Sequence, residues 1–131
     1  NIVSKKEYII YLSKNRNHTF YEENSMNGKE DPAVSDDHRL GNLWRFPVKR
    51  GTTGDNFLHK APYPQALTDR IVRISTEPGD TVLDPFLGSG TTALSALERD
   101  RQCVGFEFNQ EFETVISDRL NSLQQKYLTE F

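Results

Sequence analysis

The sequence has little cysteine and no long apolar run. With one cysteine, Cys103, in 131 residues, neither an internal disulfide framework nor a cysteine-based zinc cluster is expected, because both need several sulfurs at defined spacings. We expect no metal site and a reducing, cytoplasmic compartment. No apolar run approaches the roughly 18 residues of a membrane span, and the first residues do not form a signal peptide. From these absences we expect a soluble protein with no membrane partner.

Length and composition predict one folded domain. The 131 residues include 35% hydrophobic, 11% aromatic and 27% charged residues, which allows one compact core and is too apolar for a chain that is disordered throughout. The first residue is not methionine. We therefore expect a piece of a longer product.

The charge is unevenly distributed along the chain. The first 60 residues contain ten Lys/Arg against eight Asp/Glu, a net charge of +2, and the remainder contains six against eleven, a net charge of -5. In the basic part, cations are interleaved with aromatic residues such as Trp44, a mixture that suits phosphate contact and is also found in solvated loops. The candidates for nucleic-acid contact are Arg45, Lys49 and Arg50.

The first half of the chain shows few regular patterns. Residues 7–13 form a short apolar, β-prone run and predict a strand. Residues 22–40 have no helical or strand period and many turn formers, which predicts a loop. Residues 43–48 indicate a short strand or an extended segment.

The second half predicts a βαβ unit. A glycine turn connects its first strand to a helix, an acid ends its second strand, and Asn109 is placed to cap the amphipathic helix that follows. The expected elements are a helix at 64–75, a strand at 81–84, a helix at 91–98, a strand at 103–106 and a helix from 112 onward with Phe112, Val115, Ile116, Leu120, Leu123 and Tyr127 on one face.

The glycine turn and the acid predict a nucleoside site. Gly88 and Gly90 leave room for a ligand against the backbone, and the N–H groups of the following helix favour an anionic or carboxylate-bearing group. Glu107, at the tip of the next strand, is placed to accept hydrogen bonds from both hydroxyls of a ribose. A P-loop is disfavoured, because Thr91 rather than lysine follows the last glycine.

Two cofactors remain compatible with this turn. The sequence from Gly88 to Ala93 satisfies the loose GxGxxA pattern of dinucleotide sites. Asp84 adds a carboxylate at the strand tip, which repels a pyrophosphate and suits the ammonium of a methionine moiety, so S-adenosylmethionine fits better than NAD. A fragment of an NAD-dependent oxidoreductase and a non-catalytic nucleotide-binding or partner-binding half-domain stay open as alternatives.

Three motifs resemble those of a known enzyme family. Asp84-Pro-Phe-Leu-Gly-Ser-Gly-Thr-Thr92 is similar to the cofactor motif of beta-class amino-group DNA methyltransferases, which methylate N6 of adenine or N4 of cytosine. His59-Lys-Ala-Pro-Tyr-Pro-Gln-Ala-Leu67 resembles the segment that precedes it, with Lys60 where proline is more usual. Val104-Gly-Phe-Glu107 resembles the ribose-binding strand. The resemblance covers residues 58 to about 120, with fainter support from residues 6–14 and the Trp44 segment.

The resemblance implies a fold and a site. The fold is α/β, the cofactor-binding half of a Rossmann-like S-adenosylmethionine-dependent methyltransferase. Residues 1–14 correspond to a late strand of the catalytic half, 15–57 to a target-recognition or loop segment and 58–131 to the S-adenosylmethionine-binding region. Phe108 is either an adenine contact or, more in keeping with a strand end, a core residue. The implied cofactor residues are Ala61, Pro62, Tyr63, Asp84, Phe86, Gly88, Ser89, Gly90, Thr91 and Glu107.

One family feature is missing. The catalytic tetrapeptide Asp/Ser-Pro-Pro-Tyr/Phe does not occur, and the sequence from Asp31 to Val34 lacks its second proline and aromatic residue. The chain is therefore interpreted as the C-terminal half of a prokaryotic, site-specific DNA methyltransferase of the restriction-modification type, with no catalytic residue of its own and inactive alone. Its expected partners are DNA and a complementary chain that carries the catalytic half, or a second copy bound through exposed sheet.

Overall fold

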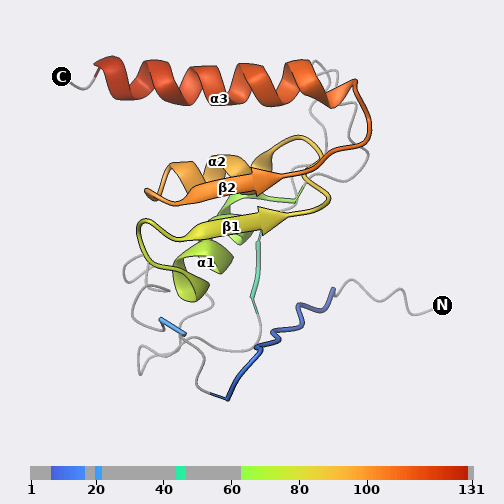
Figure 1. Cartoon of the computed structure of the whole chain (residues 1–131), viewed down its shortest axis with the longest axis vertical. Helices are drawn as coiled ribbons and strands as arrows, with labels where there is room; N and C mark the ends of the chain where they lie inside the picture. Colours follow the sequence, from blue (N-terminus) through green and yellow to red (C-terminus); the bar gives the residue numbers. More distant parts are fainter. Residues whose placement is uncertain (1–6, 17–19, 22–43, 47–62, 130–131) are drawn as a thin grey trace.

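The computed structural model contains three helices and two strands in the part of the chain that it describes. Those residues are 7–16, 20–21, 44–46 and 63–129. In chain order the elements are α1 (Gln65–Ser75), β1 (Thr81–Asp84), α2 (Thr91–Leu97), β2 (Gln102–Gly105) and α3 (Phe112–Thr129) (Figure 1). The βαβ unit and both flanking helices expected from the sequence are confirmed, with bounds that differ by at most one residue.

The two strands form a parallel pair. Thr81 is opposite Gln102 and Asp84 is opposite Gly105, so both strands end at the same edge of the sheet. The connection between them runs through α2, which packs against both strands, and α1 and α3 pack in turn against α2. Figure 1 shows α3 lying along one side of this group. The core therefore centres on α2, where Ala93 and Ala96 are 5% and 0% exposed.

The sequence explains where α1 begins and ends. Pro64 fixes the backbone before the first turn, and its carbonyl accepts a hydrogen bond from the N–H of Leu67 at 2.9 Å. At the other end, the backbone N–H and the hydroxyl of Thr76 both donate to the carbonyl of Val72, at 3.0 and 2.6 Å. Val72 and Ile74 are 3% and 4% exposed, so apolar side chains in the second half of the helix are buried.

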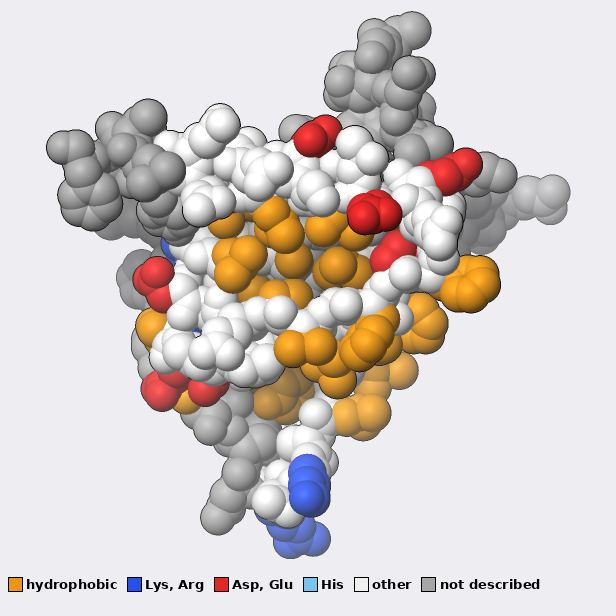
Figure 2. All heavy atoms as spheres, turned by 45° about the horizontal axis from the view of Figure 1, so that its top comes forward, with side chains coloured by type: hydrophobic (Ala, Val, Ile, Leu, Met, Phe, Trp, Pro, Cys, Tyr) orange, Lys and Arg blue, Asp and Glu red, His pale blue; other side chains and the backbone are white. Residues whose placement is uncertain are grey.

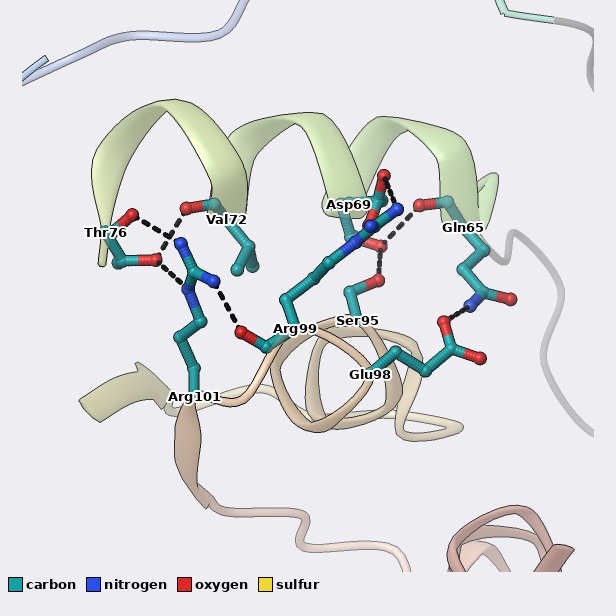
Figure 3. Close-up of polar contacts among 9 residues, drawn as sticks. Gln65, Asp69, Val72, Thr76, Ser95, Glu98, Arg99 and Arg101 are labelled. Carbon is teal, nitrogen blue, oxygen red and sulfur yellow. Dashed lines mark hydrogen bonds and ion pairs between the residues drawn. The ribbon is translucent and has the colours of Figure 1, made fainter. Parts of the chain in front are cut away.

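Polar side chains join α1 to α2 and to the turn that follows α2. The hydroxyls of Thr68 and Ser95 are 2.6 Å apart and buried. Asp69, itself buried, receives two hydrogen bonds from Arg99, from Nε to Oδ1 at 2.6 Å and from Nη2 to Oδ2 at 3.1 Å (Figure 3). A two-pronged ion pair of this kind fixes the relative orientation of its partners, so the helix pair has a defined register.

Arg101 ties the turn before β2 to the end of α1. Its Nε donates to the hydroxyl of Thr76 at 3.1 Å and its Nη2 donates to the carbonyl of Thr76 at 2.7 Å, while Nη1 donates to the carbonyl of Arg99 (Figure 3). Arg101 is 8% exposed. Its three bonds hold the turn from α2 into β2 at a fixed place, because a buried guanidinium must satisfy its donors.

The start of α3 agrees with the expected cap. Oδ1 of Asn109 accepts from the N–H of Glu111 at 3.0 Å, and its carbonyl accepts from the N–H of Phe112 at 3.1 Å. Phe112 and Leu123 are each 7% exposed. Val115, Ile116 and Leu120 are half-buried, which confirms the predicted face as far as the described side chains reach; the Tyr127 side chain lies beyond them.

Two sequence expectations are wrong, and a third concerns residues that the structure does not describe. Residues 7–13 form no strand, and Tyr8, Ile10 and Leu12 are 89%, 78% and 84% exposed. A strand needs a neighbour for its backbone groups, and the described part of the chain provides none for this segment. Phe108 is fully exposed and is not a core residue. The expected loop at 22–40 lies outside the described residues.

Within the described ranges, one face of the sheet has exposed apolar side chains. Leu83 and Val104 are paired across β1 and β2 and are 63% and 47% exposed, since α2 covers only the opposite face. Phe86 and Phe106 add exposed aromatic rings beyond the strand ends. Figure 2 shows hydrophobic side chains gathered on one face of the molecule, with acidic side chains at the border.

The described helices were compared in length and hydropathy with a membrane span. Among the residues that the structure describes, none of the helices has the length and apolar character needed to cross a membrane.

The Asp69–Arg99 pair generates a stability prediction. Asp69→Ala removes two charge-assisted hydrogen bonds, and because the Arg99 side chain is 42% exposed and partly screened, we expect the free energy of unfolding to fall by about 1–2 kcal/mol. The measurement is urea denaturation followed by circular dichroism. Asp118→Ala, an exposed position on α3, is the matched control and should shift stability by less than about 0.5 kcal/mol. Equal stability of the two variants would contradict the assigned role.

Candidate functional site

The candidate site lies beyond the carboxyl ends of β1 and β2. The loop that follows β1 crosses over the end of β2, where the N–H of Leu87 donates to the carbonyl of Phe106 at 2.8 Å. In the next bond of the ladder, the N–H of Phe106 donates to the carbonyl of Asp84 at 2.9 Å. The glycine loop and the residues after β2 are thus held against each other by backbone bonds.

Glu107 joins the two segments through its side chain. Its Oε2 accepts from the N–H of Gly88 at 2.8 Å, and its Oε1 accepts from the N–H of Asn109 at 2.7 Å. A carboxylate offers about four lone-pair sites. These two bonds orient the carboxylate at the end of β2, and its oxygens are the acceptors that a pair of ribose hydroxyls needs.

The glycines in the loop adopt backbone conformations that other residues avoid. Gly88 and Gly90 have φ of 56° and 81°, in the left-handed region. A Cβ on Gly90 would lie 3.4 Å from Cγ1 of Ile116 on α3. A side chain at Gly90 would therefore point at α3.

Asp84 has a local role as well as a charge. Its Oδ1 accepts from the N–H of Phe86 at 2.9 Å, which starts the loop after β1. Burial raises the pKa of the neighbouring Cys103 thiol, and the negative charge of Asp84 raises it further. At neutral pH the thiol is protonated and behaves as a small, weakly polar side chain.

The remaining predicted cofactor residues differ in their exposure. Tyr63, just before α1, is 62% exposed and Phe86 is 88% exposed, so both aromatic rings are available to a ligand. Ser89 is 5% exposed and Thr91 is half-buried. The positions outside the described residues are Ala61, Pro62, Lys49 and Arg50.

Sequence reasoning missed two residues at the loop. A Cβ on Gly105 would lie 2.6 Å from Cδ2 of Leu87, so a larger residue at this position would force the Leu87 side chain to move. A glycine inside a strand pattern was the available signal, because it marks close backbone approach. Arg119 on α3 donates to the hydroxyls of Ser89 and Thr91. The sequence signal for this contact was a cation among the apolar positions of the helix.

A second cluster holds the Trp44 segment. The guanidinium of Arg70 on α1 lies 5.3 Å from the ring centroid of Trp44 and 4.7 Å from that of Phe46. Burial lowers the pKa of Arg70 and the positive charge of Arg73 lowers it further, while a guanidinium stays cationic at neutral pH. Arg45, between the two aromatic residues, is exposed.

The described residues contain no cluster of three or more His, Cys, Asp or Glu side chains that could hold a metal ion. The features that define the candidate site are its glycine loop, its carboxylates and its exposed aromatic rings.

Comparison with known proteins places the chain in a family. A DNA methylase family, N6_N4_Mtase, matches residues 1–118, so the match includes the first half of the chain as well as the βαβ unit. The chain belongs to this family of DNA methylases. The family recognised from the three sequence motifs is thereby confirmed.

Individual relatives give the same result. The chain is 34% identical over 114 residues to the type II methyltransferase M.SmaI of Serratia marcescens, covering 87% of this chain and 37% of the relative. It is 32% identical over 143 residues to the type II methyltransferase M1.MboII of Moraxella bovis, covering 91% and 55%. The chain thus spans between about a third and about half of the length of these relatives.

A solved structure agrees with the fold. The crystal structure of the M1.HpyAVI–SAM complex superposes with a TM-score of 0.52 at 34% identity, covering 63% of this chain and 39% of that chain. The predicted fold class, an α/β, partial Rossmann-like methyltransferase fold, is confirmed.

Proposed function

We propose that this chain binds S-adenosylmethionine and forms the cofactor-binding part of a site-specific DNA methyltransferase acting on an exocyclic amine of adenine or cytosine. The observation that carries the proposal is the hydrogen bond from Gly88 to Glu107, which joins a glycine loop to an acid at the end of the next parallel strand. Relatives named as type II methyltransferases and a neighbour crystallised with S-adenosylmethionine support it.

The residues present fit this cofactor at both ends. Glu107, oriented by its bonds from Gly88 and Asn109, would accept hydrogen bonds from the ribose hydroxyls. Asp84 would hold the ammonium of the methionine moiety by charge. The proposed set is Ala61, Pro62, Tyr63, Asp84, Phe86, Gly88, Ser89, Gly90, Thr91 and Glu107.

Bound S-adenosylmethionine supplies an electrophilic methyl group. The chemistry needs the target base to be flipped out of the helix and its amine to be aligned with that methyl carbon. This chain holds the cofactor, and we assign it no catalytic residue, because the Pro-Pro-aromatic motif that would orient the amine is absent from its sequence.

We further propose that a complementary chain covers the exposed sheet. Val104 and Leu83 present adjacent apolar side chains on the face that α2 does not cover. Parallel sheets are normally covered on both faces and flanked by further strands. A partner that supplies the catalytic motif would dock along β1, and a second copy of this chain is the alternative occupant.

The Trp44 segment is proposed to contact DNA. Arg70 holds Trp44 and Phe46 through its guanidinium, and Arg45 between them is exposed. An arginine displayed in this way suits a phosphate contact. Lys49 and Arg50 complete the proposed set.

The cofactor proposal is tested at Glu107. Glu107→Ala removes the ribose acceptors and should weaken S-adenosylmethionine binding by about 1–3 kcal/mol, measured by isothermal titration calorimetry. Glu113→Ala, an exposed acid on α3, is the control and should bind as the unmodified chain does. Unchanged affinity in Glu107→Ala would remove this residue from the site, and preferential binding of NAD by the unmodified chain would favour the oxidoreductase alternative.

The DNA proposal is tested by salt dependence. Replacing Arg45, Lys49 and Arg50 together with glutamine should lower DNA affinity and reduce the slope of log affinity against log salt by roughly one unit for each lost phosphate contact. Fluorescence anisotropy with a labelled duplex gives the slope. An unaltered slope would favour a solvated segment.

The partner proposal is tested by methyl transfer. The purified chain, mixed with labelled S-adenosylmethionine and duplex DNA, should transfer no methyl groups alone and should become active when a chain carrying the Pro-Pro-aromatic motif is added. Incorporation of label into DNA is the readout. Robust transfer by this chain alone would overturn the proposal that catalysis needs a complementary half.

A further inference from the structure

Arg119 connects α3 to the glycine loop. Its Nη1 donates to Oγ of Ser89 at 3.3 Å and to Oγ1 of Thr91 at 3.2 Å. Both contacts come from a residue about thirty positions further along the chain and are part-buried. The guanidinium therefore bridges two of the proposed cofactor residues from the side of α3.

A second contact on the same helix face reaches the loop. Ile116 lies against Gly90, where a Cβ would be 3.4 Å from Cγ1 of Ile116. Residues three and four apart on a helix are neighbours on one face, and the buried residues Phe112 and Leu123 continue that face in both directions. Arg119 is thus a cation on the packed face of α3, directed at the loop.

The chemistry of arginine determines which groups donate and which accept in this contact. A guanidinium carries only donors, so the hydroxyls of Ser89 and Thr91 must act as its acceptors. Their own protons then point elsewhere. The two hydroxyl oxygens are 3.5 Å apart, so at most one proton is used between them and at least one is available to another acceptor.

A carboxylate is the acceptor that this arrangement suits. Ionised carboxylates accept and never donate, and hydrogen bonds to them are stronger than those between neutral groups. The positive charge of Arg119 behind the hydroxyls adds attraction for an anion. An ammonium group, which only donates, would compete with Arg119 for the same lone pairs.

We propose that Arg119 is a positioning residue of the S-adenosylmethionine site: it holds the Ser89 and Thr91 hydroxyls so that at least one of them donates a hydrogen bond to the carboxylate of the methionine moiety. The inference rests on the proposed cofactor function. It adds to that function a residue on α3, outside the sequence motifs, that determines how the amino-acid end of the cofactor is held.

The experiment compares two probes that share the nucleoside. 5′-Deoxy-5′-methylthioadenosine contains the adenosine and sulfur of S-adenosylmethionine and lacks the amino-acid end. Arg119→Met should weaken S-adenosylmethionine binding about tenfold and methylthioadenosine binding by less than about twofold. Arg119→Lys, which retains the charge and can still donate, should recover part of the loss. Calorimetry with each probe gives the affinities.

Arg99→Met is the matched control for loss of an arginine. Arg99 pairs with Asp69 and lies outside the glycine loop, so this variant should be less stable and keep the unmodified ratio between the two probes. Equal loss of both probes in Arg119→Met would assign Arg119 a purely structural role and overturn the proposal.

A double-mutant cycle tests whether Arg119 acts through the hydroxyls. In a Ser89→Ala, Thr91→Ala background, Arg119→Met should cause no further loss of S-adenosylmethionine affinity. Additive losses would overturn the proposal. Failure of the unmodified chain to bind either probe would refute the proposed function itself, whereas binding with an unchanged probe ratio in Arg119→Met would refute only the role of Arg119.

Discussion

The parallel pairing of β1 with β2 is the constraint on which the site depends. Because Asp84 is opposite Gly105, the two strands end together, and the segments that leave them are adjacent. The bond from Gly88 to the Glu107 carboxylate follows from this register, although nineteen residues separate the two positions. A shift of the register would move the acid away from the loop, because each residue along a strand advances it by about 3.3 Å.

The helices hold this edge from two directions. The polar contacts of α1 with α2 and with the turn after it, Thr68 with Ser95 and Asp69 with Arg99, hold the helix that follows the glycine loop in place. On the other side, α3 contacts the loop through Ile116 and Arg119. The loop is therefore fixed by its neighbours, while its own left-handed glycines provide the tight turn.

Apolar side chains are exposed on the sheet and in the first described segment. The sheet has one face covered by α2 and one face with Leu83 and Val104 exposed, and Tyr8, Ile10 and Leu12 in the first segment are exposed as well. The chain spans about a third to about half of its type II methyltransferase relatives. Apolar surface of this kind is stabilised when further chain covers it, which is the physical basis for proposing a complementary half.

The sequence by itself determined the elements of the second half and the residues of the glycine loop. Period and turn signals located α1, β1, α2, β2 and the start of α3, since each depends on local backbone preferences and on which face is apolar. The motif around Gly88 and Glu107 identified the family, and the family match confirmed it. Local signals do not reveal which side chains meet across the fold.

Tertiary structure alone decided the remaining features. The apolar run at 7–13 forms no strand, because strand formation depends on a neighbour that no local pattern supplies. Phe108, expected in the core, is fully exposed for the same reason: a strand-end residue is buried only if another element covers it. Local signals at Gly105 and Arg119 do not specify the approach of Leu87 to Gly105 or of Arg119 to Ser89, since both arise from packing between elements distant in the chain.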